Sequence, residues 1–178
     1  MTRTRSALRW LPTFLGFPAG GLVAELIAGP VDGLAAALLA GAITGSILGA
    51  VQSWGMGPNG PPAREWIAAT AAGLTVGLAL GSAAVDYGTS LADLVVQGAI
   101  CGLAIGGAQA LVLRGRAAYL WAPALSALWA LGWAVTTSIG IDVETQYTVF
   151  GASGALVVTA ATALLPVLLA TRALPSAS

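Results

Sequence analysis

The sequence predicts an all-α integral membrane protein. The expected architecture is a bundle of six transmembrane helices, formed by three repeated hairpins of the same orientation, with both termini in the cytoplasm. The prediction rests on an apolar composition, on six apolar stretches of crossing length and on arginines confined to one side. Of the 178 residues, 57% are hydrophobic and 8% are charged, whereas a soluble domain carries roughly 25% charged residues. The chain lacks the polar surface of a water-soluble globule, so we expect one transmembrane domain over residues 1–178.

Six apolar stretches follow one another, each close to the roughly 20 residues that one helical crossing needs. They cover residues 10–28, 34–54, 66–85, 94–113, 117–139 and 148–170. Polar residues or turn formers separate them, such as GPVDG at 29–33. Paired in order, the stretches predict hairpins over about 10–54, 66–113 and 117–170. We expect the first stretch to stay in the mature protein rather than to be cleaved as a signal peptide, because its glycines recur later in the chain.

All seven arginines fall on one side of a six-crossing arrangement. They are Arg3, Arg5 and Arg9 before the first helix, Arg64 before the third, Arg114 and Arg116 before the fifth, and Arg172 after the sixth. The loops on the other side hold acidic residues and no basic one. Because arginines near crossing ends stay on the cytoplasmic side, we place both termini in the cytoplasm. The protein itself is expected in the inner membrane of a bacterial cell. Five or seven crossings would break this pattern.

An internal repeat links the hairpins. The segment GAITGSILGAVQ of residues 41–52 recurs as GAICGLAIGGAQ of residues 98–109, a shift of 57 residues. The same shift carries Gly16 and Gly20 onto Gly73 and Gly77. Residues 151–162 form a weaker third copy, with Thr162 in the glutamine position. Hairpins that repeat in the same orientation predict a parallel repeat around an axis along the membrane normal.

The repeated glycines form narrow stripes on their helices, because positions three and four apart share one face. Small residues at this spacing let two backbones approach closely in lipid. The predicted packing residues are Gly16, Gly20, Gly41, Gly45, Gly49, Gly73, Gly77, Gly98, Gly102 and Gly106. They could pack helices within the chain, or they could line a pathway or an interface between subunits. The glutamines that end two stripes, Gln52 and Gln109, are expected to hydrogen-bond a neighbouring helix, with ligand binding as the alternative.

This glycine and glutamine motif, with a tryptophan opening the next helix (Trp66, Trp121), resembles a group of small uncharacterised bacterial integral membrane proteins built from such hairpins. The resemblance spans most of the chain and implies a fold but no function. The third copy departs from the motif because it lacks the glutamine, so the three hairpins are not strictly equivalent.

Three further residues are candidates for a ligand or ion site. Glu25 is the one acidic residue inside an expected crossing, where burial of a charge is costly and suggests a function. It lies about one turn from the outer end, so placement at the interface is the alternative. Trp129 and Trp133 lie one turn apart near the middle of the fifth stretch, as an aromatic wall for an apolar ligand or as filling between helices.

Tryptophan and proline have expected structural roles, the tryptophans at the crossing ends and the prolines within helices. Trp10, Trp54, Trp66 and Trp121 stand at crossing ends and are expected to be interfacial anchors. Pro18 and Pro166 are expected inside helices, each with a kink, and an ion site at the carbonyl oxygens that they release is the alternative.

The composition excludes several kinds of chemistry. The chain has no His and no Lys, and its sulfur comes from Cys101, Met1 and Met56. This excludes His or Cys metal sites, Ser-His-Asp catalysis and internal disulfides, so we expect no metal, no cofactor and no catalytic residue. The arginines are scattered without interleaved aromatic residues, which argues against nucleic-acid binding.

The sequence therefore favours a non-enzymatic membrane subunit for packing or assembly, with membrane lipid, a second copy or another membrane protein as partner. The alternative is a subunit that binds or transports a small molecule, lipid or ion. In length and helix count the chain is similar to the substrate-binding components of vitamin importers, which implies a partner-facing role for Gly16 and Gly20.

Overall fold

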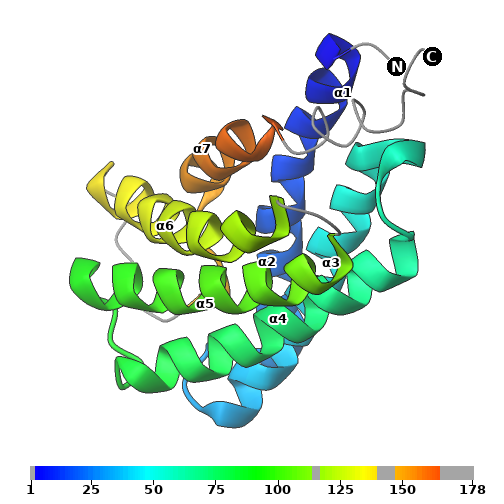
Figure 1. Ribbon diagram of the computed structural model, residues 1–178. Coiled ribbons are helices and arrows are strands. Elements are labelled where there is room, and N and C mark those ends of the chain that lie inside the picture. Colours follow the sequence, from blue (N-terminus) through cyan, green and yellow to red (C-terminus); the bar gives the residue numbers. More distant parts are fainter. Residues whose placement is uncertain (1–2, 114–116, 140–146, 165–178) are drawn as a thin grey trace, which may run out of the picture.

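The computed structural model describes residues 3–113, 117–139 and 147–164, and all regular structure within them is helical (Figure 1). The elements are α1 (Arg3–Trp10), η1 (Leu11–Leu15), α2 (Gly16–Ala28), α3 (Leu34–Met56), η2 (Gly57–Asn59), α4 (Ala63–Ala84), α5 (Leu91–Val112), α6 (Ala117–Ser138) and α7 (Ala152–Thr162). Five helical stretches among these residues are long and apolar enough to cross a membrane: Arg5–Ala28, Leu34–Met56, Ala63–Ala84, Leu91–Val112 and Ala118–Ser138. The predicted all-α membrane bundle is thus confirmed at this level, while α7 is a shorter apolar helix.

The apolar run of the first stretch predicted one continuous α-helix, but the structure shows an interruption. A 3₁₀ turn, η1, separates α1 from α2, with Pro12 near the start of η1. Pro18 lies in the first turn of α2, where a backbone N–H would have no partner in the helix anyway. Pro18 thus lies inside the helical span Arg5–Ala28, and the α-helical geometry of that span is interrupted at η1, just before Pro18. Pro166 lies outside the described residues.

The last helix begins later than predicted. Gly151 has extended backbone angles (φ −66°, ψ 177°) and α7 starts at the next residue, so Thr148 and Phe150 precede the helix and pack into the interior. Residues 165–170 of the predicted stretch lie outside the described residues. The middle four helices agree with the predicted ranges to within three residues at each end. At α5 the earlier start follows from Ser90, whose hydroxyl accepts the backbone N–H of Asp93 in a capping box.

The helices pack in chain order from α2 to α7, and α7 contacts η1, which closes them into a ring. Glycines make the close approaches. A Cβ built on Gly45 would lie 2.7 Å from Ala71 Cα of α4, and one on Gly77 would lie 2.9 Å from Cys101 Cα of α5. These separations are shorter than real Cβ contacts, so only glycine leaves room for the neighbouring backbone at these two positions.

Every predicted packing glycine faces a helix of the same chain. Gly16 and Gly20 lie against α3, Gly41, Gly45 and Gly49 against α4, Gly73 and Gly77 against α5, and Gly98, Gly102 and Gly106 against α6. Of the two alternatives left open by the sequence, these contacts match packing within the chain.

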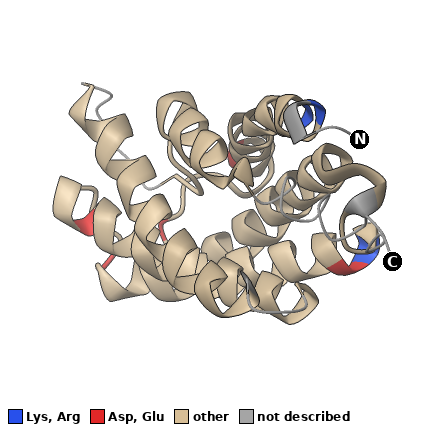
Figure 2. Ribbon diagram, turned by 45° about the horizontal axis from the view of Figure 1, so that its top comes forward, with Lys and Arg blue, Asp and Glu red and all other residues tan. Residues whose placement is uncertain are grey.

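The outside of the bundle is apolar and its ends are charged. Large apolar side chains are exposed on all the long helices, among them Leu26, Leu39, Leu80, Leu103 and Leu131, as expected for surfaces that face lipid. Figure 2 shows the described arginines toward one end of the bundle and most of the acidic residues toward the other. We call these the arginine end and the acidic end.

Candidate functional site

Three tryptophans near the arginine end each donate an indole hydrogen bond to another helix. Trp66 Nε1 donates to Gln52 Oε1 of α3 at 3.1 Å, and Trp121 Nε1 donates to Gln109 Oε1 of α5 at 2.8 Å. Trp10 Nε1 is shared between Thr162 Oγ1 and the carbonyl oxygen of Thr159 on α7, both at 3.1 Å. Each tryptophan thus stands near the start of one predicted hairpin and bonds a residue near the end of another. We call these contacts the ring of indole bonds.

The two glutamines also bond each other, so the contacts form a network. Gln109 Nε2 donates to Thr70 Oγ1 at 2.9 Å and to Gln52 Oε1 at 3.3 Å. Gln52 Oε1 therefore accepts from both Trp66 and Gln109. Thr70 in turn donates to the carbonyl oxygen of Trp66 at 2.8 Å. A single buried polar cluster joins α3, α4, α5 and α6, and it satisfies groups that would be costly to bury alone.

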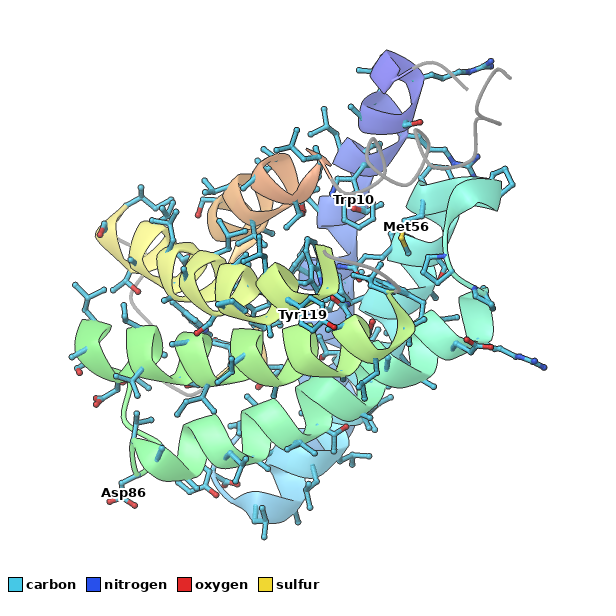
Figure 3. All side chains as sticks on the ribbon, in the orientation of Figure 1. Trp10, Met56, Asp86 and Tyr119 are labelled. Carbon is cyan, nitrogen blue, oxygen red and sulfur yellow. The ribbon has the colours of Figure 1, made fainter. Side chains whose placement is uncertain are left out.

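Two tryptophans of this ring, Trp10 and Trp66, are not the interfacial anchors that their positions predicted, whereas Trp121 is partly exposed. Trp10 is 2% exposed and Trp66 is fully buried, and both belong to an apolar cluster with Met56 and Leu113. Trp10 and Met56 lie together near the arginine end, far from Asp86 (Figure 3). Only Trp54 matches the expectation of a largely exposed ring, at 55%. The indoles turn inward because buried amide and hydroxyl oxygens offer their N–H groups an acceptor.

The sequence contains a signal for this ring, because both its donors and its acceptors recur at a nearly constant spacing. The tryptophans at 10, 66 and 121 recur 56 and 55 residues apart, close to the shift of the glycine motif. The acceptors Gln52, Gln109 and Thr162 occupy the corresponding position of the three proposed copies. Thr70 and Thr159 carry no such signal, because single threonines in apolar helices are common.

The ring of indole bonds encloses very little free space. The cavity beside it, lined by Trp10, Gln52, Gln109, Trp121 and Thr162 together with apolar residues below them, offers about 10 Å³ to the centre of a water molecule. That is room for roughly one water, whereas small-molecule sites measure about 300–1,000 Å³. Amide, indole and hydroxyl groups in so small a space can hold helices together, but they have no room for a vitamin-sized ligand.

Trp129 and Trp133 pack against other aromatic rings in the middle of the bundle. Trp129 meets Phe150 edge-on with ring centroids 5.1 Å apart, and Trp133 meets it edge-on at 6.1 Å. Phe17 of α2 stacks on Phe150 at 5.1 Å and also contacts Trp129 at 5.7 Å. Both indoles are almost fully buried. This aromatic cluster fills the space between α2, α6 and the segment before α7, and its geometry is that of favourable aromatic pairs.

Glu25 stands apart from the other candidate residues. It lies in the last turn of α2 and is partly exposed, and its backbone carbonyl accepts the N–H of Gly29 at 3.0 Å. Within the part of the chain that the structure describes, no side chain bonds its carboxylate. The structure brings Gln52 and Gln109 together, and Trp129 together with Trp133, but it places Glu25 with neither pair.

The described residues contain no group of three or more His, Cys, Asp or Glu side chains that could hold a metal ion. Trp66, Thr70 and Gln109, the most buried members of the network, do not ionise near neutral pH, so they supply hydrogen bonds rather than proton transfer. Comparison of the chain with protein-family models, with curated proteins and with solved structures finds no match.

Proposed function

We propose that this protein is a non-enzymatic membrane subunit that serves packing or assembly, in the inner membrane of a bacterium. The observation that carries the proposal is the close packing of the described residues at the two candidate sites in the interior. The cavity beside the ring of indole bonds has room for about one water. The aromatic cluster occupies the middle of the bundle. The described residues of both candidate sites are thus packed against one another, whereas the outer surface is apolar and suited to lipid or to another membrane protein.

In this proposal the chain crosses the membrane six times as three parallel hairpins, with α7 in the last crossing and both termini in the cytoplasm. Two observations support the arrangement. The indole bonds join corresponding positions of the three copies, and the described charges separate between the two ends (Figure 2). The partner is membrane lipid together with a second copy or another membrane protein.

Flux measurements on reconstituted vesicles test this proposal against the transport alternative. We expect the native protein to give no proton or cation flux above empty vesicles. A transporter that couples through Glu25 would give flux in the native protein and none in Glu25→Gln, because the amide cannot take up and release a proton. Asp32→Asn is the matched control, since it removes one exposed acidic group from the loop after α2. Native flux that Glu25→Gln abolishes and Asp32→Asn preserves would overturn the packing role.

Native mass spectrometry of the purified protein tests the partner. We expect a fixed number of subunits or a second membrane protein with retained lipid, and no bound metabolite. A monomer that carries a metabolite in stoichiometric amount would contradict the proposal.

A further inference from the structure

A second feature of the arginine end is an open hollow on the outside of the bundle. It measures about 660 Å³ and is lined by Arg5, Leu8 and Arg9 of α1 and by Trp54 of α3. These residues stand near the ends of two candidate membrane spans, Arg5–Ala28 and Leu34–Met56. The hollow therefore lies at the level where lipid headgroups meet the hydrocarbon core. We call it the α1–α3 hollow.

Arg9 is held in a fixed position at this hollow. Its guanidinium carbon lies 5.1 Å from the centre of the Trp54 ring, as a cation–π pair. On another side, Arg9 Nη1 lies 3.1 Å from the place that a Cβ on Gly57 would occupy. Gly57 ends α3 with a φ of 66°, a conformation that suits glycine. The turn after α3 thus leaves space for the arginine, which loses little freedom when it binds an anion.

No described residue neutralises the positive charge of the α1–α3 hollow. Arg5 precedes Arg9 by four residues on α1, so both guanidinium groups project from the same face of the helix. Among the residues that the structure describes, no carboxylate forms an ion pair with either of them, and Arg9 Nε is buried without an acceptor. Two arginines on one face match the geometry of a phosphate, which can accept hydrogen bonds from both.

Apolar groups stand beside these charges. Leu8 is 62% exposed and the Trp54 ring is 55% exposed. A free phosphate would use the arginines and leave both apolar side chains in contact with water. A phospholipid would use all four residues, because its phosphate is attached to glycerol and acyl chains. The combination therefore favours a lipid over a soluble anion.

We propose that the α1–α3 hollow binds one anionic phospholipid by its headgroup phosphate. Arg9 is the preorganised donor and Arg5, which is exposed, is the second donor. Leu8 and Trp54 contact the glycerol and the first carbons of the acyl chains. The inference is independent of the packing role, because it concerns a site on the outside of the bundle.

Native mass spectrometry of the full chain in neutral detergent, titrated with dioleoylphosphatidylglycerol, tests the site. We expect one lipid to bind more tightly than the others and more tightly than dioleoylphosphatidylcholine. Arg5→Gln should weaken that first binding event about five-fold, the effect of one arginine near an anionic lipid. Arg64→Gln is the matched control, since Arg64 is exposed near the start of α4 and does not line the hollow. It should change the affinity less than two-fold.

Arg9→Lys provides a second variant that keeps the charge. We expect it to weaken binding as well, because an ammonium lacks the planar donor geometry and stacks less well on Trp54. Equal losses in Arg5→Gln and Arg64→Gln would show a general surface attraction and overturn the site. Equal affinity for the two lipids would do the same. Competition by sn-glycerol 3-phosphate at the concentration of the lipid would overturn the lipid assignment, since it would show that the apolar residues contribute nothing.

Discussion

Two buried glutamines on α5 show how differently one residue type can be used. Gln109 is 1% exposed and makes hydrogen bonds with both ends of its amide. Gln97 is fully buried, and neither its Nε2 nor its Oε1 has a partner among the described residues. Ser82 near the end of α4 is likewise buried without a partner for its hydroxyl. A buried polar group without a partner costs roughly 1–3 kcal/mol, so these two glutamines should respond in opposite ways to an apolar replacement.

We expect Gln109→Met to destabilise the protein by about 1–2 kcal/mol, because it leaves Trp121, Thr70 and Gln52 with fewer partners. Gln97→Met should be neutral or stabilising, since methionine has a similar volume and needs no partner. Reversible unfolding of both variants in mixed micelles measures the free energies. A loss for Gln97→Met as large as that for Gln109→Met would mean that a bound water satisfies the Gln97 amide.

The ring of indole bonds also shows which properties of single residues the sequence predicts and which it does not. The pairing of Gln52 and Gln109 with neighbouring helices follows from their place at the end of a packing stripe. The inward orientation of Trp10 and Trp66 does not follow from their positions, because a tryptophan at a crossing end is commonly found at the lipid interface. Its direction depends on whether an acceptor lies within reach after folding, and for Trp10 that acceptor is 152 residues away at Thr162.

At the scale of the helices, glycine determines how close two axes can come. A Cβ on Gly106 would lie 2.5 Å from Ala122 Cα of α6, whereas one on the adjacent Gly107 would meet nothing within 4 Å. Neighbouring glycines on one helix thus differ completely in their surroundings. The pair separates the effect of helix packing from the effect of losing a glycine.

We expect Gly106→Ala to destabilise the protein by about 1–3 kcal/mol, because the added methyl group pushes α5 and α6 apart. Gly107→Ala should instead be neutral or stabilising by up to about 1 kcal/mol, since alanine favours the helix over glycine. Thermal unfolding in detergent measures both changes. If the two variants were equally stable, the close contact between α5 and α6 would not contribute to stability.

The helices themselves were largely predictable, because apolar stretches of crossing length leave few alternatives in lipid. The exceptions have local causes that hydropathy does not detect. The 3₁₀ turn before α2 follows from two prolines near its ends, Pro12 and Pro18. The late start of α7 follows from Gly151 and from Phe150, whose ring packs among Phe17, Trp129 and Trp133. Such aromatic packing depends on three segments far apart in the chain.

At the scale of the whole molecule, the charge difference between the two ends determines the expected orientation. Ala63 starts α4 at the arginine end, and Ala92 lies in the first turn of α5, near the acidic residues Asp86 and Asp93. Both alanines are exposed. Cys101 is buried and can be replaced by serine, so that it does not contribute to labelling.

In Cys101→Ser, we expect Ala92→Cys to react with an impermeant maleimide in intact cells, and Ala63→Cys to react only after the cells are opened. The reason is that the arginine end stays on the cytoplasmic side. Labelling yield on a gel measures both. If only Ala63→Cys reacted in intact cells, the orientation would be the reverse of the one expected. If both variants reacted, the number of crossings between the two positions would have to differ.

The hydrogen bond from Trp10 to α7 has a consequence for biogenesis. A chain is made from its N-terminus at about 5–20 residues per second, so Trp10 is synthesised on the order of 10–30 s before Thr159 and Thr162. During that interval the Trp10 indole does not yet have the acceptors that it uses in the folded chain. We therefore expect the contact between α1 and α7 to form late, and a nascent chain that ends before α7 to lack the bond that joins its first helix to its last.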